Sequence, residues 1–331
     1  MSLVVPCYNA SETIGDCLEA IGAQTRPADE VIVVDDASDD DTAAIVAAHA
    51  CTLLTQERNR GPSAARNAGI AAANGEVLFF VDADVALRPD AVERALALLE
   101  GDPGLDIVHG TYEPRPLRGR GTVERYLIGR EAHWRHRCAG EAGTVVFAVA
   151  AVRSRVFERF GLLDESLRDC EDVEYSTRLA RRARIVITEA VAGYHDAGGT
   201  LRAALATQWR RSVPLARLAA ARPGVRLERI NRLRSLLAAA AAPVAAAATP
   251  WFWPAAPIAL LAAALALVFD ADLLRSLVRG HGARSLAPFA AVHLCFLVVL
   301  VAGIAVGIAA VPYTRVFSRT PSERNADYAT H

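Results

Sequence analysis

The chain has 331 residues, of which 53% are hydrophobic, and its formal net charge is −1. This length accommodates one large domain, or one domain with an appendage. Because basic residues are not in excess, the composition argues against nucleic acid as a partner. Acidic residues are concentrated in the first two thirds, whereas the chain from about Leu236 onward is rich in Ala, Leu and Val. The sequence therefore predicts a soluble domain followed by a membrane region.

Short apolar runs alternate with helical segments over about the first 110 residues. Strands are predicted at residues 3–5, 30–34, 52–55 and 76–81, and helices at residues 11–24, 41–49, 63–74 and 88–100. Ser11 and Ser63 are the predicted N-caps of their helices. Because helices separate the strands, right-handed crossovers and a parallel sheet are expected. The predicted fold class is α/β, with a doubly wound, mostly parallel sheet.

The pattern is weaker from Ile107 to Ile187. The expected elements are a strand at 144–149, a helix at 153–160, an acidic loop at 164–172, a helix at 173–182 and a strand at 184–188. We place the end of the first domain at residue 199. The next segment, residues 200–235, carries Arg202, Arg210, Arg211 and Arg217 beside Trp209. A basic helix with an indole is suited to the lipid surface, so membrane lipid is an expected partner.

Residues 236–312 form the predicted transmembrane region. The apolar stretch 236–269 is too long for one span of about 20 residues. Two prolines and three aromatic residues interrupt it at "TPWFWP", Thr249–Pro254, which predicts a helical hairpin. A third apolar segment covers residues 287–311, and a polar tail follows at 313–331. Two or three crossings are compatible with this pattern, and buried helices of a soluble protein are the alternative.

The start of the chain, "MSLVVPCYN", lacks the basic and apolar regions of a secretory signal. Arginines also flank the apolar segments, in "RINRLR" before the first and at Arg275, Arg279 and Arg284 before the third. Cytoplasmic loops are enriched in such residues. The expected location is the inner (cytoplasmic) membrane, with the first domain in the cytoplasm.

Two acidic clusters follow apolar strands. In "VIVVDDASDDDT", Asp35 and Asp36 come directly after four apolar residues, where carboxylates can accept hydrogen bonds from a base or a ribose. Ser38 or Asp41 could instead cap the next helix. In "GEVLFFVDADV", Asp82 and Asp84 share one side of the chain because alternate residues of a strand do so. Two such carboxylates suit Mg²⁺ or Mn²⁺ bound to a diphosphate, and ordinary turn residues at a strand end are the alternative.

A third cluster opens a predicted helix at "CEDVEYSTRLAR". Glu171 and Asp172 stand where the helix dipole favours acids, and they could also provide a general base. His195 in "GYHDAGG" is a possible metal ligand or an ordinary polar residue. Arg66 in "NRGPSAARNAGI" could contact a diphosphate or lie on the surface, while Gly69 allows close helix packing.

Taken together, these stretches resemble family 2 glycosyltransferases with the GT-A fold. The motifs "VVPCYNA", "VIVVDDASDDDT", "NRGPSAARNAG", "GEVLFFVDADV" and "CEDVEYSTRLAR" stand in the family's order over residues 3–179. The resemblance implies that Pro6, Tyr8 and Asn9 line a nucleotide pocket. It further implies that Asp36 binds the base, with Asp35 nearby.

The same resemblance implies the chemistry. Asp84 is the closer metal ligand of the Asp82–Asp84 pair, Asp172 is the catalytic base, and His195 completes the metal site in some members. Asp82 could instead face the ribose of the donor or the waters of the metal. The implied activity is an inverting, Mn²⁺- or Mg²⁺-dependent transfer from a UDP-, GDP- or dTDP-sugar to a glycan or polyprenyl-linked hydroxyl. The stretch "QWRR" departs from the QxxRW signature of processive synthases, which argues against processive polymerisation.

Three rival functions are weaker. A nucleotidyltransferase would have a glycine-rich phosphate loop after the first strand, and "VPCYNASET" has none. A dinucleotide oxidoreductase would have GxGxxG at the same place. A sugar-nucleotide-binding protein without catalysis would be expected to lack one of the carboxylate pairs, and both are present.

Overall fold

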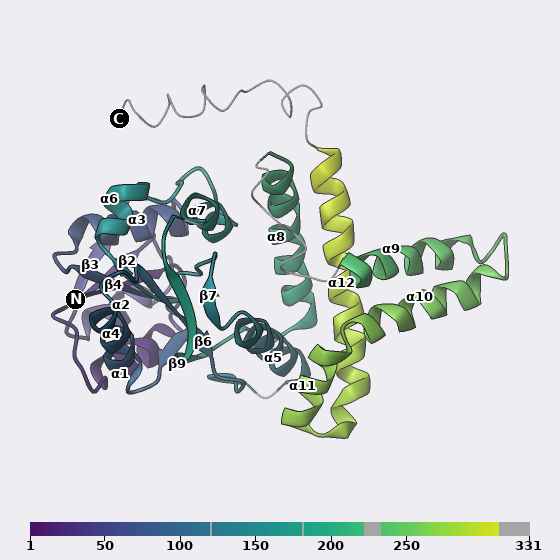
Figure 1. Ribbon diagram of the computed structural model, residues 1–331, viewed down its shortest axis with the longest axis horizontal. Helices are drawn as coiled ribbons and strands as arrows, with labels where there is room; N and C mark the ends of the chain where they lie inside the picture. The colour runs from purple at the N-terminus through teal and green to yellow at the C-terminus, as the bar shows by residue number, and fades with distance from the viewer. Residues whose placement is uncertain (120, 181, 222–232, 311–331) are drawn as a thin grey trace. The chain divides into compact units, whose positions relative to one another are not determined.

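Figure 1 shows the protein as a computed structural model, which describes residues 1–119, 121–180, 182–221 and 233–310. The chain forms two compact units. The first comprises Met1–Leu201 together with Asp272–Phe289, and the second comprises Arg202–Ala271 and the chain from Ala290 onward. The first unit thus includes Asp272–Phe289 in addition to the residues of the predicted domain. The predicted domain limits, residues 1–199, stay a prediction.

A mixed sheet, nine-stranded within the described residues, forms the centre of the first unit (Figure 1). Its order is β3-β2-β1-β4-β8-β6-β9-β5, and β7 pairs with β9. The strands are β1 (Ser2–Cys7), β2 (Glu30–Asp35), β3 (Thr52–Thr55), β4 (Val77–Val81), β5 (Val85–Leu87), β6 (Ile107–Tyr112), β7 (Gly140–Ala142), β8 (Val149–Arg153) and β9 (Ile185–His195).

The first four strands of the chain are parallel, as predicted. Strand β8 lies antiparallel between β4 and β6, and β5 and β7 are antiparallel to β9. The carboxyl ends of β1, β2 and β4 therefore meet at one edge of the sheet, where ligands of open α/β sheets collect.

Helices cover both faces of this sheet. They are α1 (Ile14–Gly22), α2 (Thr42–Ala47), α3 (Pro62–Ala72), α4 (Ala91–Gly101), α5 (Thr122–Arg137), α6 (Arg155–Phe160) and α7 (Glu171–Leu179). Alternate residues of β4 supply two separate cores. Phe79 and Val81 pack with residues of α1 and α4, whereas Leu78 and Phe80 pack with residues of α6 and α7. A strand buried on both faces is apolar throughout, which explains the run "VLFFV".

The strand predicted at residues 144–149 is wrong. The strand is β8, Val149–Arg153, which begins where the prediction ends. Val145 and Phe147 are buried against Tyr175 of α7, and the Val145 N–H donates to Ser176 Oγ at 3.0 Å instead of to a strand. Their apolar character therefore reflects packing beneath a helix and not pairing in a sheet.

The predicted helix caps are also wrong. Helix α1 begins three residues after Ser11, with Thr13 at the N-cap position, and α3 begins at Pro62 with Gly61 before it, so Ser63 lies inside the helix. Asp41 does precede α2, but its side chain makes no capping bond. Strand β6 and helix α5 lie in the region where the sequence pattern weakens, and the prediction omitted both.

The second unit is helical. It contains α8 (Leu201–Ala221), α9 (Leu233–Ala248), α10 (Ala255–Phe269) and most of α12 (Leu286–Ala309); α11 (Ala271–His281) belongs mainly to the first unit. Helices α9 and α10 run side by side (Figure 1) and form the predicted hairpin, with its turn at residues 249–254. Ala239, Ala266 and Leu297 share a small apolar core.

One segment, Ala283–Ala309, is long and apolar enough to cross a membrane, judged over the residues that the structure describes. Helices α10 and α11 pass the same test only as a pair, and they are bent by 69° at the break between them. Helix α9 is shorter than a span. The polar tail and most of "RINRLR" lie outside the described residues.

Candidate active site

The first acidic cluster holds two loops at the carboxyl edge of the sheet. Asp35 is 1% exposed, and its Oδ1 accepts hydrogen bonds from the N–H and the hydroxyl of Ser38. Asp36 is 3% exposed, and its two oxygens accept the N–H groups of Arg60 and Gly61, each at 2.7 Å. Asp36 fixes the start of α3, so the loop after β2 and the start of this helix are held together.

The loop after β1 borders the same place. Asn9 has a left-handed backbone, with φ of 48°, and its N–H donates to Ser38 Oγ at 2.9 Å. Its side-chain oxygen accepts the N–H of Asp39 at 3.0 Å. Tyr8 is 49% exposed, and Pro6 is half-buried in β1. The phenol ring is therefore available to a ligand, while Asn9 joins the loops after β1 and β2.

Arg66 connects the second and third clusters. This residue is 4% exposed, so the surface alternative is wrong. Its Nη2 donates to Asp82 Oδ1 at 2.8 Å and its Nη1 donates to Glu171 Oε1 at 2.7 Å. Although burial acts to lower it, the nearby carboxylates, Asp82 foremost, raise the pKa of Arg66 above its ordinary value. The buried guanidinium of Arg66 thus links the end of β4 to the start of α7 through two ion pairs.

Asp172 lies beside this ion pair in the first turn of α7. Its Oδ1 is buried and has no hydrogen-bond partner among the described residues. Burial, followed by the charge of Glu171, raises the pKa of Asp172 to about 7, and the charge of Arg66 opposes the shift. A carboxylate with a free oxygen and a pKa near neutrality is suited to accept a proton from a substrate.

Asp84 and His195 form a second pair at this edge. Strands β5 and β9 are antiparallel with Val85 opposite His195, which brings the imidazole to the residue before β5. The His195 Nε2 lies 3.3 Å from Asp84 Oδ2. Burial lowers the pKa of His195, but the Asp84 carboxylate more than offsets this, and the net shift is upward.

This pair fits a divalent cation. Asp84 Oδ1 and His195 Nδ1 are buried without hydrogen-bond partners in the part of the chain that the structure describes. Within the same residues, no group of three or more His, Cys, Asp or Glu side chains could hold a metal. Two protein ligands leave most positions of Mg²⁺ or Mn²⁺ open for phosphate oxygens and water. Asp82 differs from Asp84 because one of its oxygens is bound to Arg66.

The prediction missed two residues behind His195. The imidazole stacks on the ring of Tyr112, and the guanidinium of Arg135 lies over the same ring. Tyr112 ends β6 at the carboxyl edge, so recognition of "IVHGTY" as a strand would have indicated its position. Arg135 belongs to α5, whose many charged residues gave no sign that one of them is buried.

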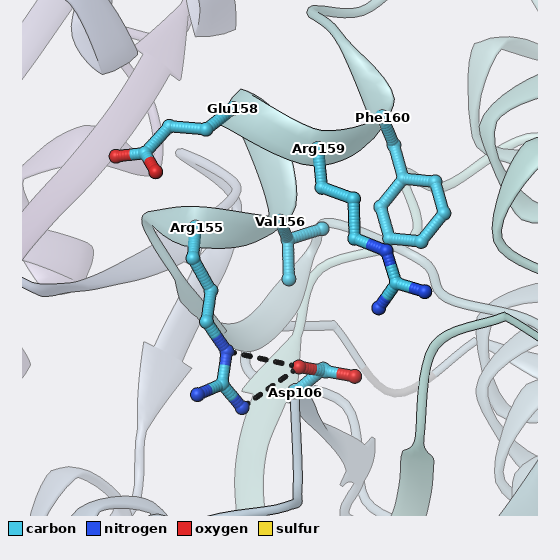
Figure 2. Close-up of a pocket in the computed structure, with 6 residues that line it drawn as sticks. All are labelled: Asp106, Arg155, Val156, Glu158, Arg159 and Phe160. Carbon is cyan, nitrogen blue, oxygen red and sulfur yellow. Dashed lines mark hydrogen bonds and ion pairs between the residues drawn. The ribbon is translucent and has the colours of Figure 1, made fainter.

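A separate pocket of about 360 Å³ lies at the other end of the sheet (Figure 2). Helix α6 lines it and follows β8, which runs antiparallel to β4, so the pocket is at the amino end of β4. Figure 2 shows Arg155 bonded to Asp106 there, through Nε at 3.1 Å and Nη2 at 2.9 Å. The pocket contains none of the predicted site residues.

Much of the first unit is similar in sequence to known proteins. The model of glycosyl transferase family 2 matches residues 2–161, which include Asp36, Arg66, Asp82 and Asp84 and end before Asp172. The glycosyltransferase AglE of Haloferax volcanii is 35% identical over 133 residues, 38% of this chain and 43% of AglE. The succinoglycan biosynthesis protein ExoO of Rhizobium meliloti is 43% identical over 99 residues, 29% of this chain and 28% of ExoO. The chain thus spans less than half the length of either relative.

Among solved structures, the mannosyltransferase PcManGT of Pyrobaculum calidifontis, in complex with GDP-Man and Mn²⁺, has the same fold. It is 23% identical, with a TM-score of 0.58, and the alignment covers 96% of this chain and 87% of that one. This likeness confirms the predicted GT-A architecture. The sequence match over residues 2–161, most of the first unit, shows that this part of the chain is a member of glycosyl transferase family 2.

Proposed function

We propose that this enzyme transfers a sugar from a nucleotide-sugar donor to an acceptor hydroxyl with inversion at the anomeric carbon. The observation that carries the proposal is the Arg66 bridge between Asp82 and Glu171. It brings the Asp82–Asp84 motif and the catalytic candidate Asp172 to one edge of the sheet, although they are far apart in the sequence.

Each part of the site has a role in this reaction. The exposed ring of Tyr8 and the loops held by Asn9, Asp35 and Asp36 would bind the nucleoside. Asp84 and His195, with Asp82 near them, would hold Mn²⁺ or Mg²⁺, which when bound supplies positive charge beside the donor diphosphate. The buried charge of Arg66 adds to this positive charge.

The bond changes are those of a single displacement. Asp172 accepts the proton of the acceptor hydroxyl, and that oxygen forms a bond to the anomeric carbon. The bond between this carbon and the diphosphate oxygen breaks, and its electron pair leaves with the nucleoside diphosphate. Because attack and departure occur on opposite sides, the anomeric configuration inverts. Glu171 supports the base by keeping Arg66 in place.

The acceptor side of the proposal concerns the membrane. A glycan or polyprenyl-linked hydroxyl at the inner membrane suits a chain with one helix long and apolar enough to span, within the described residues, and an apolar hairpin beside it. The name of ExoO refers to the biosynthesis of a glycan, succinoglycan, which supports an acceptor of this class. In this proposal the first unit lies on the cytoplasmic side of the membrane, where it can bind nucleotide sugars from the cytoplasm.

A screen of the full-length protein in detergent tests this function. UDP-, GDP- and dTDP-sugars are added singly with Mn²⁺, and the thermal unfolding midpoint is measured. A donor present at about 100 times its Kd stabilises the folded state by about 2.7 kcal/mol, so the true donor stands out. NMR of the product then reports the anomeric configuration. Retention of configuration, or the absence of any stabilising donor, contradicts the proposal.

A further inference from the structure

We propose that Tyr112 and Arg135 are positioning residues that fix the plane of the His195 imidazole at the metal site. The inference rests on the proposed function, because it concerns the same divalent cation. Neither residue belongs to the acidic motifs, and both lie on elements that the sequence did not predict.

The first observation is the stack itself. The ring centres of Tyr112 and His195 are 4.5 Å apart, and the ring planes differ by 14°. The Arg135 guanidinium carbon lies 3.9 Å from the centre of the Tyr112 ring. Two flat groups cannot share one face of a six-membered ring at these distances without overlapping. The Tyr112 ring therefore lies between the imidazole on one face and the guanidinium on the other.

The second observation is that Arg135 is anchored. It is 2% exposed, and its Nη1 lies 3.0 Å from His109 Nε2 and 3.3 Å from the carbonyl oxygen of Gly110. A desolvated guanidinium over an aromatic face is among the stronger cation–π arrangements. Strand β6 carries His109, Gly110 and Tyr112, so both the ring and the cation are held by the same strand.

The third observation concerns what His195 lacks. A histidine that binds a metal normally donates its other ring N–H to an oxygen, which sets the orientation of the ring. Here Nδ1 is buried and has no hydrogen-bond partner in the described parts of the chain, while Nε2 faces Asp84 at 3.3 Å. Rotation of the imidazole is therefore limited by the Tyr112 stack, which takes the place of the missing hydrogen bond.

Mn²⁺ alone is the probe. Its dissociation constant for the full-length protein in detergent is measured by the relaxation rate of water protons, without any donor or turnover. Tyr112→Met removes the ring at similar length and is expected to weaken Mn²⁺ binding about tenfold, the lower end of the usual effect of groups that orient metal ligands. Tyr112→Phe keeps the ring and should retain the wild-type constant. Arg135→Met provides a second variant, with the same direction expected, in case Tyr112→Met does not fold.

A double-variant cycle separates positioning from general damage to the fold. In the His195→Ala background, the Tyr112→Met change should have no further effect on Mn²⁺ binding, because its action passes through the imidazole. Equal weakening with and without His195, or unchanged binding in Tyr112→Met and Arg135→Met, overturns the inference. If His195→Ala itself leaves Mn²⁺ binding unchanged, the metal site in the proposed function is wrong, and that outcome is distinct from the first two.

Discussion

Arg66 Nη2 lies 2.8 Å from Asp82 Oδ1 in a site where the arginine side chain is 5% exposed. Removing one partner of a buried ion pair leaves an uncompensated charge and costs about 3–5 kcal/mol. Arg66→Met leaves the carboxylates of Asp82 and Glu171 facing each other without a cation. We expect a much lower thermal unfolding midpoint and loss of sugar transfer.

The control for this variant is Arg26→Met. Arg26 also forms a 2.8 Å ion pair, with Glu100, but its side chain is 45% exposed and that of Glu100 is 59% exposed. Ion pairs this exposed to water contribute little to stability, so this change should leave the midpoint and the activity near the wild-type values. Equal effects of the two variants would show that the Arg66 bridge has no special role.

Asp172→Asn tests the catalytic base. The amide keeps the shape of the side chain but cannot accept the proton of the acceptor hydroxyl, so transfer should fall by about 10²–10⁴-fold. Donor binding, measured by the thermal shift with Mn²⁺, should survive. Glu158→Gln, at the opposite end of the sheet, makes the same kind of change away from the site and should leave transfer unaffected. Normal turnover of Asp172→Asn would remove Asp172 from the mechanism.

The raised pKa of Asp172 predicts a pH dependence. Burial is the main cause of the shift to about 7, and only the deprotonated form can act as a base. The value of kcat/KM should therefore rise with pH through about 7 and level off above it. An ordinary carboxylate would give a rate that is already constant at pH 6. Measurement of kcat/KM between pH 5 and 9, with the Mn²⁺ concentration held at saturation, distinguishes the two.

Gly69 provides a test of packing. A Cβ at this position would lie 2.3 Å from Val4 Cγ1, so α3 could not keep its distance from β1. Gly69→Ala should lower stability by about 1–3 kcal/mol, the usual cost of overpacking. Gly22→Ala at the end of α1 is the matched control, because a Cβ there has no neighbour within 4 Å. A lower unfolding midpoint is expected for the first variant only.

Local sequence predicted the parts of the site that local structure creates. Asp82 and Asp84 follow an apolar strand, and the sequence alone could place them at the edge of the sheet. The bridge from Arg66 to Glu171 could not be predicted in this way, because 105 positions separate the two residues. Whether Arg66 lies on the surface or in the interior depends on that distant carboxylate and not on its neighbours in α3.

The errors in the fold have the same origin. Tertiary packing places Val145 beneath α7, although valine favours strands, and the strand begins only at Val149. The stack on His195 joins Tyr112 and Arg135, which come from elements that the periodicity did not reveal. The sequence pattern does not reveal residues that act through a neighbour, such as Tyr112 and Arg135. It does reveal carboxylates at the end of an apolar strand, such as Asp82 and Asp84.

The hairpin of α9 and α10 gives a last prediction, on depth in the membrane. The helices have 16 and 15 residues, or about 24 and 22 Å at 1.5 Å per residue, against about 30 Å of hydrocarbon. Trp251 and Trp253 at the tip are 86% and 79% exposed. In the turn, the N–H groups of Trp251 and Phe252 donate to the Ala248 carbonyl oxygen. Proline has no N–H group, so Pro250 and Pro254 leave no backbone donor that would need water inside the bilayer. The tip is therefore expected to stop inside the bilayer.

Tryptophan quenching measures this depth directly. A variant that keeps only Trp253, with the other tryptophans changed to Phe, is placed in vesicles that contain lipids brominated at defined acyl positions. Quenching by bromines within the acyl chains, with little quenching by aqueous iodide on either side, is the expected result. A variant that keeps only Trp134, in α5 of the first unit, is the control and should not respond to the acyl bromines. Iodide quenching of Trp253 from the far side would instead indicate a full crossing, because a tip that emerges from the bilayer meets water.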